Sequence, residues 1–419
     1  MRRSLNLLGL MLAMLVSLAI SPRSDAQPNT KAPKPGLLKV VFQKGSEEQR
    51  LAALSEIESY YRSSPEWAEV LASVIAANSR KAPIALSTLN AVRLFERVDE
   101  PRLRSRQVEF LASPHLPIVV AAAEELAQRK FPEARESLQQ IRERREFSQS
   151  YALRHLVTTS VAVYQDRRAV KDLIDIASQY DGQLRYLAVT KLEQLTSQNF
   201  GGFIDKWVEW FQLQPDDYIP SPAPGRSPNS NEAPKPIAWP TPVPKFFETP
   251  VFAKRVVFLL DSSGSMQSTV DDETRMDQVR SEFNRMLREM PSSSFFNVLA
   301  FNDRVIPRGS GLTEADAVNK ADAARFVEQL TPEHKTATYE ALIAALTHDP
   351  NLEAIYFLTD GKPTAGTIQV QPVIVSRITS LNATSRIAIN SIGIDTTGED
   401  LDFIKQLADQ NFGTSRVIR

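Results

Sequence analysis

Cysteine is absent from the 419-residue sequence, and this absence excludes several kinds of chemistry. Without cysteine the chain can form neither a disulfide framework nor a thiolate metal site, and it cannot carry a lipid on an N-terminal cysteine. Histidine is scarce as well. The four histidines, at positions 115, 155, 334 and 348, do not have the spacing of a metal-binding pair.

A net charge is also nearly absent, because 49 basic residues stand against 50 acidic ones and leave a formal charge of -1. No global electrostatic field draws such a chain to nucleic acid or to an anionic membrane, so we expect no nucleic-acid partner. The composition is that of a folded protein, with 42% hydrophobic residues. The length is too great for one hydrophobic core and indicates two or three domains.

The N-terminus has the pattern of an export signal. Arg2 and Arg3 precede an apolar run over residues 7–20, and the small residues Ser24 and Ala26 stand at the -3 and -1 positions of a cleavage after Ala26. We therefore predict a signal peptide at 1–26, a short disordered segment at 27–35, and an exported protein, in a bacterial periplasm, cell envelope or extracellular space. The alternative is an uncleaved membrane anchor, although the apolar run is shorter than the roughly 20 residues that span a bilayer.

Residues 36–214 have helical periodicity, and a short Ala/Leu signature recurs within them. Its copies begin at Ala53, Ala85, Ala122, Ala152 and Ala188. The copies start 30 to 37 residues apart. A loose period of this length is typical of two-helix repeats, in which stacking buries the apolar stripe of each pair. The region resembles HEAT and armadillo α-solenoids, and an irregular helical bundle is the alternative.

Eleven of the chain's 27 prolines lie between positions 215 and 250, so we predict an extended linker there.

From 251 to 419 buried-type strands alternate with amphipathic helices, which predicts an α/β domain with a doubly wound, Rossmann-like, mostly parallel sheet of six strands. The expected strands are 255–260, 295–301, 305–306, 354–358, 387–394 and 416–418.

Oxygen-bearing side chains gather at the ends of two of these strands. The run "VVFLLDSSGSM" ends a strand in Asp261 and continues with Ser263 and Ser265, while "FLTDGK" ends another strand in Asp360. Thr336 precedes an amphipathic helix. Ligands of a doubly wound sheet bind at the carboxyl ends of its strands, and hard oxygen ligands suit Mg²⁺, Mn²⁺ or Ca²⁺. Two carboxylates in one crevice are costly without a cation or a proton.

Asp261-x-Ser263-x-Ser265, Thr336 and Asp360 match, in order and in strand context, the metal-ion-dependent adhesion site of von Willebrand factor type A domains, and residues 251–419 resemble that family. The resemblance implies that the three hydroxyls ligate the ion directly and that the two aspartates act largely through water. It also implies an open position for a Glu or Asp carboxylate of a partner protein. This chain departs from the family at His334 and Lys335, where glycines are common.

These observations favour an exported, non-enzymatic binding protein, in which the metal site engages an acidic group of a partner and the helical repeats serve as a scaffold. A metal-dependent hydrolase or phosphatase is one alternative, although the sequence has no G-x-S-x-G elbow and no P-loop lysine motif. In a second alternative the helical solenoid binds the partner and the α/β domain is passive.

Overall fold

The computed structural model describes residues 34–58, 65–80, 83–221, 237–270 and 272–419, and the predicted signal peptide lies outside them. Contacts between residues divide the chain into two compact units, 1–139 and 140–419. This grouping cuts across the predicted helical domain of 36–214 and joins residues 140–214 to the α/β part. Within the described ranges, no helix has both the length and the apolar character needed to cross a membrane.

The described part of the first unit is helical. Its elements are α2 (Pro35–Lys44), α3 (Glu47–Ile57), α4 (Pro65–Asn78), α5 (Leu86–Glu96), the 3-10 turn η3 (Pro101–Leu103), α6 (Arg104–Glu109), the 3-10 turn η4 (Phe110–Ala112) and α7 (Leu116–Gln128), and α8 (Pro132–Arg142) runs across the division between the units. Helix α3 packs on α5, and α5 packs on α7. The first three copies of the Ala/Leu signature lie in or at the start of these helices, and Ala122 is fully buried. The repeat character of the region stays a prediction.

The second unit begins with α9 (Arg145–Gln149), α10 (Tyr151–Ala162), α11 (Arg167–Gln179), α12 (Gly182–Thr196) and α13 (Ile204–Gln212). Two of these helices contact the α/β part directly. From α10, the His155 ring accepts a hydrogen bond at its Nδ1 from Nε of Arg386, at 2.9 Å. From α12, the ring of Tyr186 stacks on Phe252 at 4.2 Å between centroids.

The α/β part contains the predicted sheet. Its strands are β3 (Arg255–Asp261), β6 (Phe295–Phe301), β7 (Val305–Pro307), β8 (Thr313–Glu314), β9 (Ala354–Thr359), β10 (Ala388–Ile394) and β11 (Ser415–Ile418). Among the described residues they form one seven-stranded sheet in the order β11-β10-β9-β3-β6-β7, with the short β8 paired to β6. The five strands from β11 to β6 pair in parallel, and β7 and β8 run antiparallel to β6. The mostly parallel sheet was therefore predicted correctly, except for β8, which is too short to leave a pattern.

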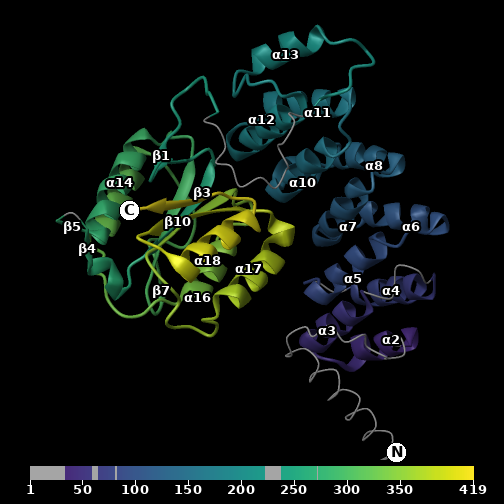
Figure 1. Ribbon diagram of the computed structural model, residues 1–419, viewed down its shortest axis with the longest axis horizontal. Helices are drawn as coiled ribbons and strands as arrows, with labels where there is room; N and C mark the ends of the chain where they lie inside the picture. The colour runs from purple at the N-terminus through teal and green to yellow at the C-terminus, as the bar shows by residue number, and fades with distance from the viewer. Residues whose placement is uncertain (1–33, 59–64, 81–82, 222–236, 271) are drawn as a thin grey trace, which may run out of the picture. The chain divides into compact units, whose positions relative to one another are not determined.

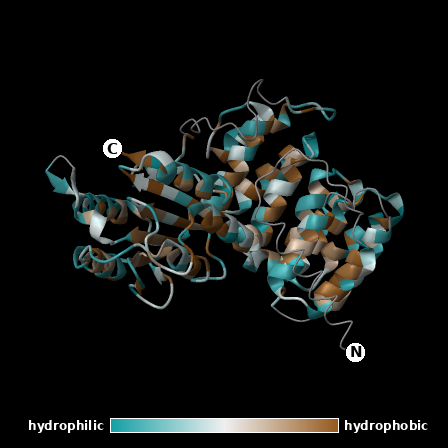
Figure 2. Cartoon of the chain, turned by 60° about the horizontal axis from the view of Figure 1, so that its bottom comes forward, coloured by the Kyte–Doolittle hydropathy of each residue, from teal (hydrophilic) through white to brown (hydrophobic). Residues whose placement is uncertain are grey.

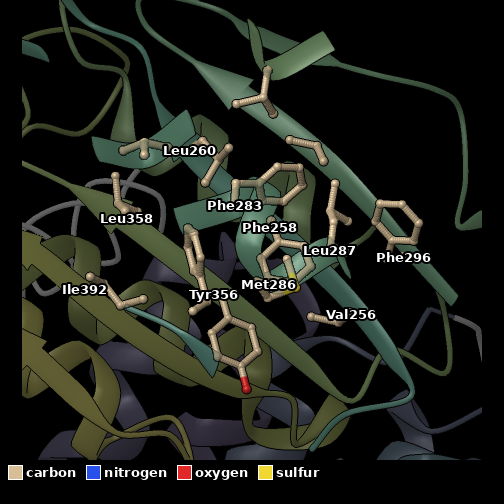
Figure 3. Packing of buried hydrophobic residues seen from close by; sticks show 14 of the residues in the cluster. Val256, Phe258, Leu260, Phe283, Met286, Leu287, Phe296, Tyr356, Leu358 and Ile392 are labelled. Carbon is tan, nitrogen blue, oxygen red and sulfur yellow. The ribbon is translucent and has the colours of Figure 1, made fainter. Parts of the chain in front are cut away.

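Helices cover both faces of this sheet (Figure 1). They are α14 (Arg275–Glu289) and α15 (Ala317–Glu328) on one face, and α16 (Thr338–Leu346), α17 (Gln371–Ser385) and α18 (Gly398–Asp409) on the other. Alternate side chains of β3 lie in the hydrophobic cores on opposite faces of the sheet. Phe258 packs with Phe283 and Tyr356 on the α14 face (Figure 3), and Leu259 lies in the core on the other face. Burial on both faces explains the hydrophobic colour that recurs along the strands of the sheet in Figure 2.

The strand order places a topological switch point between β3 and β9. From β3 the chain moves outward to β6 and β7, and it then returns to add β9 on the other side of β3. The connections on the two sides of this point run in opposite directions, which leaves a crevice between the carboxyl ends of β3 and β9. Asp261 is the last residue of β3, and Asp360 follows the last residue of β9.

The described residues at the end of the predicted linker pack against the fold. The backbone N–H of Gly202 donates to the carbonyl of Ala238 at 2.8 Å, and the ring of Trp239 lies 4.9 Å from that of Phe252. The short strands β1 (Lys245–Phe246) and β2 (Thr249–Pro250) then form a hairpin that places Phe246 in the core. Residues 237–250 are therefore held by contacts along their length.

Two further short strands, β4 (Thr269–Val270) and β5 (Glu273–Thr274), form a second hairpin just before α14. The side chain of Thr274 then caps α14 by accepting a hydrogen bond from the backbone of Asp277 at 3.1 Å. This capping box fixes the first turn of the helix, so the following residue, Arg275, has a defined place at the rim of the crevice.

Candidate functional site

Asp261 is a carboxylate with no exposure to solvent at the end of β3. Its Oδ1 accepts the backbone N–H of Ser263 at 2.8 Å, and its Oδ2 accepts the hydroxyl of Thr359 at 2.7 Å. Burial and, to a lesser degree, the charge of Asp360 raise the pKa of Asp261 to about 6, although these hydrogen bonds oppose the rise. The carboxylate is thus held in a fixed position in which its own negative charge is poorly stabilised.

Three of the other predicted ligands are linked to one another by hydrogen bonds. The hydroxyl oxygens of Ser263 and Ser265 lie 3.1 Å apart, and the Ser265 hydroxyl donates to Oδ1 of Asp360 at 2.8 Å. The short 3-10 turn η5 (Gly264–Gln267) bends the chain after β3 and brings these serines over the crevice. The structure therefore brings four predicted ligands together: Asp261 at the end of β3, Ser263 and Ser265 in the loop after it, and Asp360 just after β9.

Backbone hydrogen bonds fix the loop that carries Thr336. On one side the carbonyl of His334 accepts the N–H of Gly264 at 3.1 Å, which ties this loop to the β3 loop. On the other side the carbonyl of Thr336 accepts the backbone N–H groups of Thr364 and Ala365, at 3.0 and 3.1 Å, which ties it to the loop after Asp360. Thr336 is buried between them, so all three predicted loops meet at one place.

The two departures from the family pattern, His334 and Lys335, are both exposed. His334 has a φ of +64°, in the left-handed region that glycine enters without steric cost. This backbone geometry gives a physical reason for the glycine that the family often has here. In this chain the loop keeps its course with a histidine, whose Nε2 lies 3.3 Å from Oε1 of Glu333.

Three residues around the crevice were missed by the sequence interpretation: Thr359, Arg275 and Asp395. Thr359 binds Asp261, as described. Arg275 lies at the start of α14, where its Nη1 is 2.7 Å from Oδ2 of Asp360 and its Nη2 is 3.2 Å from Oδ2 of Asp395. Asp395 follows the end of β10, so the rule that located Asp261 and Asp360 would have located it too. Arg275 leaves no such signal, because only the folded chain brings it to the crevice.

The donors in the crevice suit a hard divalent cation. They are carboxylate and hydroxyl oxygens, the class of ligand that Mg²⁺, Mn²⁺ and Ca²⁺ prefer. A cation would also relieve the unfavourable charge of the buried Asp261. Across the described residues, no three His, Asp or Glu side chains cluster in a way that could hold a metal ion. An ion in this crevice would therefore depend on the hydroxyls of Ser263, Ser265 and Thr336 as well as on carboxylates.

Comparison with known proteins agrees with this architecture. The sequence model of the family described as von Willebrand factor type A domain matches residues 254–417. The human inter-alpha-trypsin inhibitor heavy chain H2 is 27% identical over 176 residues, which are 39% of this chain and 18% of that protein. The human heavy chain H6 is 30% identical over 185 residues, covering 40% of this chain and 13% of that protein. The present chain thus spans less than a fifth of the length of either relative.

Similar solved structures include a von Willebrand factor type A protein from Catenulispora acidiphila and the PilB minor pilin from Streptococcus sanguinis. The first is 24% identical with a TM-score of 0.34, covering 41% of this chain and 40% of that one. The second is 15% identical with a TM-score of 0.31, covering 41% and 58% of the two chains. On the family match and the parallel sheet with its switch point, residues 254–417 of this chain form a von Willebrand factor type A domain.

Proposed function

We propose that this protein is a non-enzymatic binding protein whose von Willebrand factor type A domain holds a divalent cation in the crevice between β3 and β9. Asp261, Ser263, Ser265, Thr336 and Asp360 hold the ion, the hydroxyls directly and the aspartates largely through water, and Mg²⁺ is the expected ion, with Mn²⁺ or Ca²⁺ as substitutes. The bound ion supplies an electrophilic centre, which a carboxylate of a partner protein completes. The nearly neutral net charge gives no reason to expect a nucleic-acid partner.

One observation carries this proposal. The fully buried Asp261 faces the charge of Asp360 across the switch point, where burial and this charge raise its pKa to about 6. Proteins rarely bury a carboxylate in this way without a counter-charge. The hydroxyls beside it face the same crevice as hard oxygen donors. A bound cation would compensate the charge of Asp261 and so explain why the carboxylate is buried here.

Two adjacent serines provide a matched test of the metal site. Ser263 and Ser262 are both buried, but the hydroxyl of Ser262 donates to the carbonyl of Phe301 at 3.1 Å, away from the proposed ligands. We expect calorimetric titration of the full chain with Mg²⁺ and Mn²⁺ to show one saturable site. Ser263→Ala should weaken it by about 10- to 100-fold, the range seen when the surroundings of a bound metal are disturbed, while Ser262→Ala should leave it within about twofold.

Asp261→Asn should abolish the site, since the buried position then carries no charge. Saturable binding that survives Asp261→Asn and Ser263→Ala equally would disprove the proposed ligand set. With Mn²⁺ bound, glutarate can serve as a probe for the carboxylate that a partner would supply. We expect glutarate to displace water from the ion, which lowers the proton relaxation rate of the solvent. An unchanged rate at saturating glutarate would argue against a carboxylate ligand.

The rest of the chain has a proposed role as a scaffold. We propose a HEAT-like helical domain over 36–214, a proline-rich linker over 215–250, and a binding domain over 251–419. Packing of α3 on α5, of α5 on α7 and of α10 on α12 supports repetition, because these helices carry the Ala/Leu signature. If the first helices serve only as a scaffold, a variant from which residues 36–139 are deleted should keep its Mg²⁺ affinity in the same titration. Loss of metal binding from a deleted variant that still folds would give those helices a part in the site.

We also propose export, with residues 1–26 as the signal peptide. The basic start and the apolar run in the sequence support it. Mass spectrometry of the protein from an expressing bacterium should then find a chain that begins at Gln27. A chain that keeps residue 1 and fractionates with membranes would instead support the uncleaved anchor.

A further inference from the structure

Arg275 forms a bridge between two carboxylates at the rim of the crevice. Its Nη1 lies 2.7 Å from Oδ2 of Asp360, while its Nε and Nη2 lie 3.3 and 3.2 Å from Oδ2 of Asp395. The side chain of Asp360 is only 1% exposed and that of Arg275 is 18% exposed. An ion pair with this little solvent around it is screened weakly, so it restrains both side chains more than a surface pair would.

The second oxygen of Asp360 is engaged as well. Its Oδ1 accepts the hydroxyl of Ser265 at 2.8 Å. A serine hydroxyl has one proton and two lone pairs, so Ser265 can donate to Asp360 and still offer a lone pair to a cation. Asp360 keeps free lone pairs on both oxygens, but its carboxylate cannot move toward the ion without lengthening its bond to Arg275 or to Ser265. Arg275 and Ser265 therefore hold the Asp360 carboxylate behind the hydroxyl oxygens that would contact the ion.

We infer that Arg275 is a positioning residue that holds Asp360 out of direct contact with the bound cation, so that this carboxylate reaches the ion only through water. Asp395 holds the other side of the guanidinium and so keeps Arg275 in place beside Asp360. The inference rests on the proposed function, since it concerns the same site. Its consequence is that the ion keeps more of its positive charge and one more exchangeable position, and both favour an anionic ligand from a partner.

The charges of Arg275 and Asp360 support the same positioning role. Asp360 shares its negative charge with a full positive charge at 2.7 Å, so it offers less to an ion in the crevice than a free carboxylate would. Removing the guanidinium should free Asp360 to move toward the ion. Binding of the ion should become tighter, and binding of an external carboxylate should become weaker. An arginine that merely stabilised the fold would change neither quantity in this pattern.

Water counting on Mn²⁺ tests the inference. Proton relaxation of the solvent measures how many exchangeable waters the ion carries, so it reports on the ligands without any activity assay. In Arg275→Met we expect the full-length protein to lose about one Mn²⁺-bound water, to bind Mn²⁺ about tenfold more tightly, and to bind glutarate more weakly. Arg275→Lys keeps a cation beside Asp360 and should restore most of the wild-type relaxation rate.

A second ion pair provides the control. Arg255, at the opposite end of β3, lies 2.5 Å from Asp349, and its side chain is 32% exposed. Arg255→Met should leave the Mn²⁺ affinity and the relaxation rate unchanged. If Arg275→Met does not fold, Asp395→Asn is the substitute, because it releases the other side of the guanidinium; it should shift affinity and relaxation in the same direction by a smaller amount.

The outcomes separate this inference from the proposed function. If wild-type protein binds no Mn²⁺, the proposed function fails and the inference fails with it. If wild-type protein binds Mn²⁺ but Arg275→Met keeps the same relaxation rate and affinity, the metal site stands and the positioning role of Arg275 is overturned. A weaker Mn²⁺ site in Arg275→Met, with the water number unchanged, would also overturn it, because the arginine would then act only by supporting the fold.

Discussion

Replacing Glu353 by glutamine should stabilise the protein in mild alkali and leave its stability unchanged in acid. Glu353 lies just before β9, where α12 meets the sheet. Its Oε2 accepts the backbone N–H of Lys254 at 2.9 Å, and the backbone of Gln183 at the start of α12 also donates to it. Burial raises the pKa of Glu353 from its ordinary value of 4.5 to about 6, against the opposing effect of these hydrogen bonds and of nearby arginines.

Proton linkage determines whether the stability of the fold rises or falls with pH. A raised pKa means that the folded protein binds this proton more tightly than the unfolded chain does. The stabilisation is therefore fully present below pH 4.5 and is lost as the pH rises through about 6. The difference between these two pKa values corresponds to roughly 2 kcal/mol, at about 1.4 kcal/mol per pH unit. Glutamine resembles the protonated acid and does not titrate, so Glu353→Gln should match wild type near pH ~4 and exceed it by up to roughly 2 kcal/mol at pH ~8.

Urea unfolding at several pH values between about 4 and 8 measures this difference. Tryptophan fluorescence is a suitable signal, because three of the four tryptophans, at 207, 210 and 239, belong to the unit that contains Glu353. Glu328→Gln, at an exposed position near the end of α15, is the matched control and should follow wild type at every pH. A free-energy difference between Glu353→Gln and wild type that stays constant across this pH range would refute the reasoning.

Three other predictions concern the same unit. Phe283→Ala should lower the free energy of unfolding by about 3–5 kcal/mol in urea titrations, because the ring is fully buried against Phe258; a loss under about 1 kcal/mol would contradict the packing. Tyr356→Phe should cost about 1–3 kcal/mol, since its hydroxyl donates to the carbonyl of Pro250 at 2.5 Å, and an unchanged melting temperature would show that this bond contributes nothing. His334→Gly should raise the melting temperature slightly, by relief of about 1 kcal/mol at its positive φ; a lower melting temperature would mean that the histidine side chain stabilises the loop.

The sequence predicted the sheet, and the closeness of Asp261 and Asp360, where the pattern is local. Phe295–Phe301 begins and ends where expected, because seven consecutive residues of a doubly buried strand leave a clear apolar run. Asp261 and Asp360 stand out for the same reason: each is the first charged residue after such a run. Their closeness followed from the expected parallel topology, and the switch point between β3 and β9 provides it.

The parts that were missed depend on contacts distant in sequence. Arg275 lies 85 residues from Asp360 and 120 from Asp395, and no periodicity connects an arginine at a helix start to two strand ends. Trp239 shows the same limit, since its proline-rich surroundings predict an exposed spacer while its ring packs on Phe252. Propensity describes the neighbours along the chain, whereas these positions are set by neighbours in space.

The two ends of β3 have different attachments, and this determines how the domain would carry a mechanical load. Just before its first residue, Nζ of Lys254 lies 2.9 Å from Asp181 at the start of α12, and its last residue is Asp261 in the crevice. A pull on a partner held at the crevice, resisted through α12, would run lengthwise along the strand. Because β3 pairs in parallel over its whole length with β6 and over five residues with β9, such a pull would load these hydrogen bonds together in shear instead of opening them one at a time.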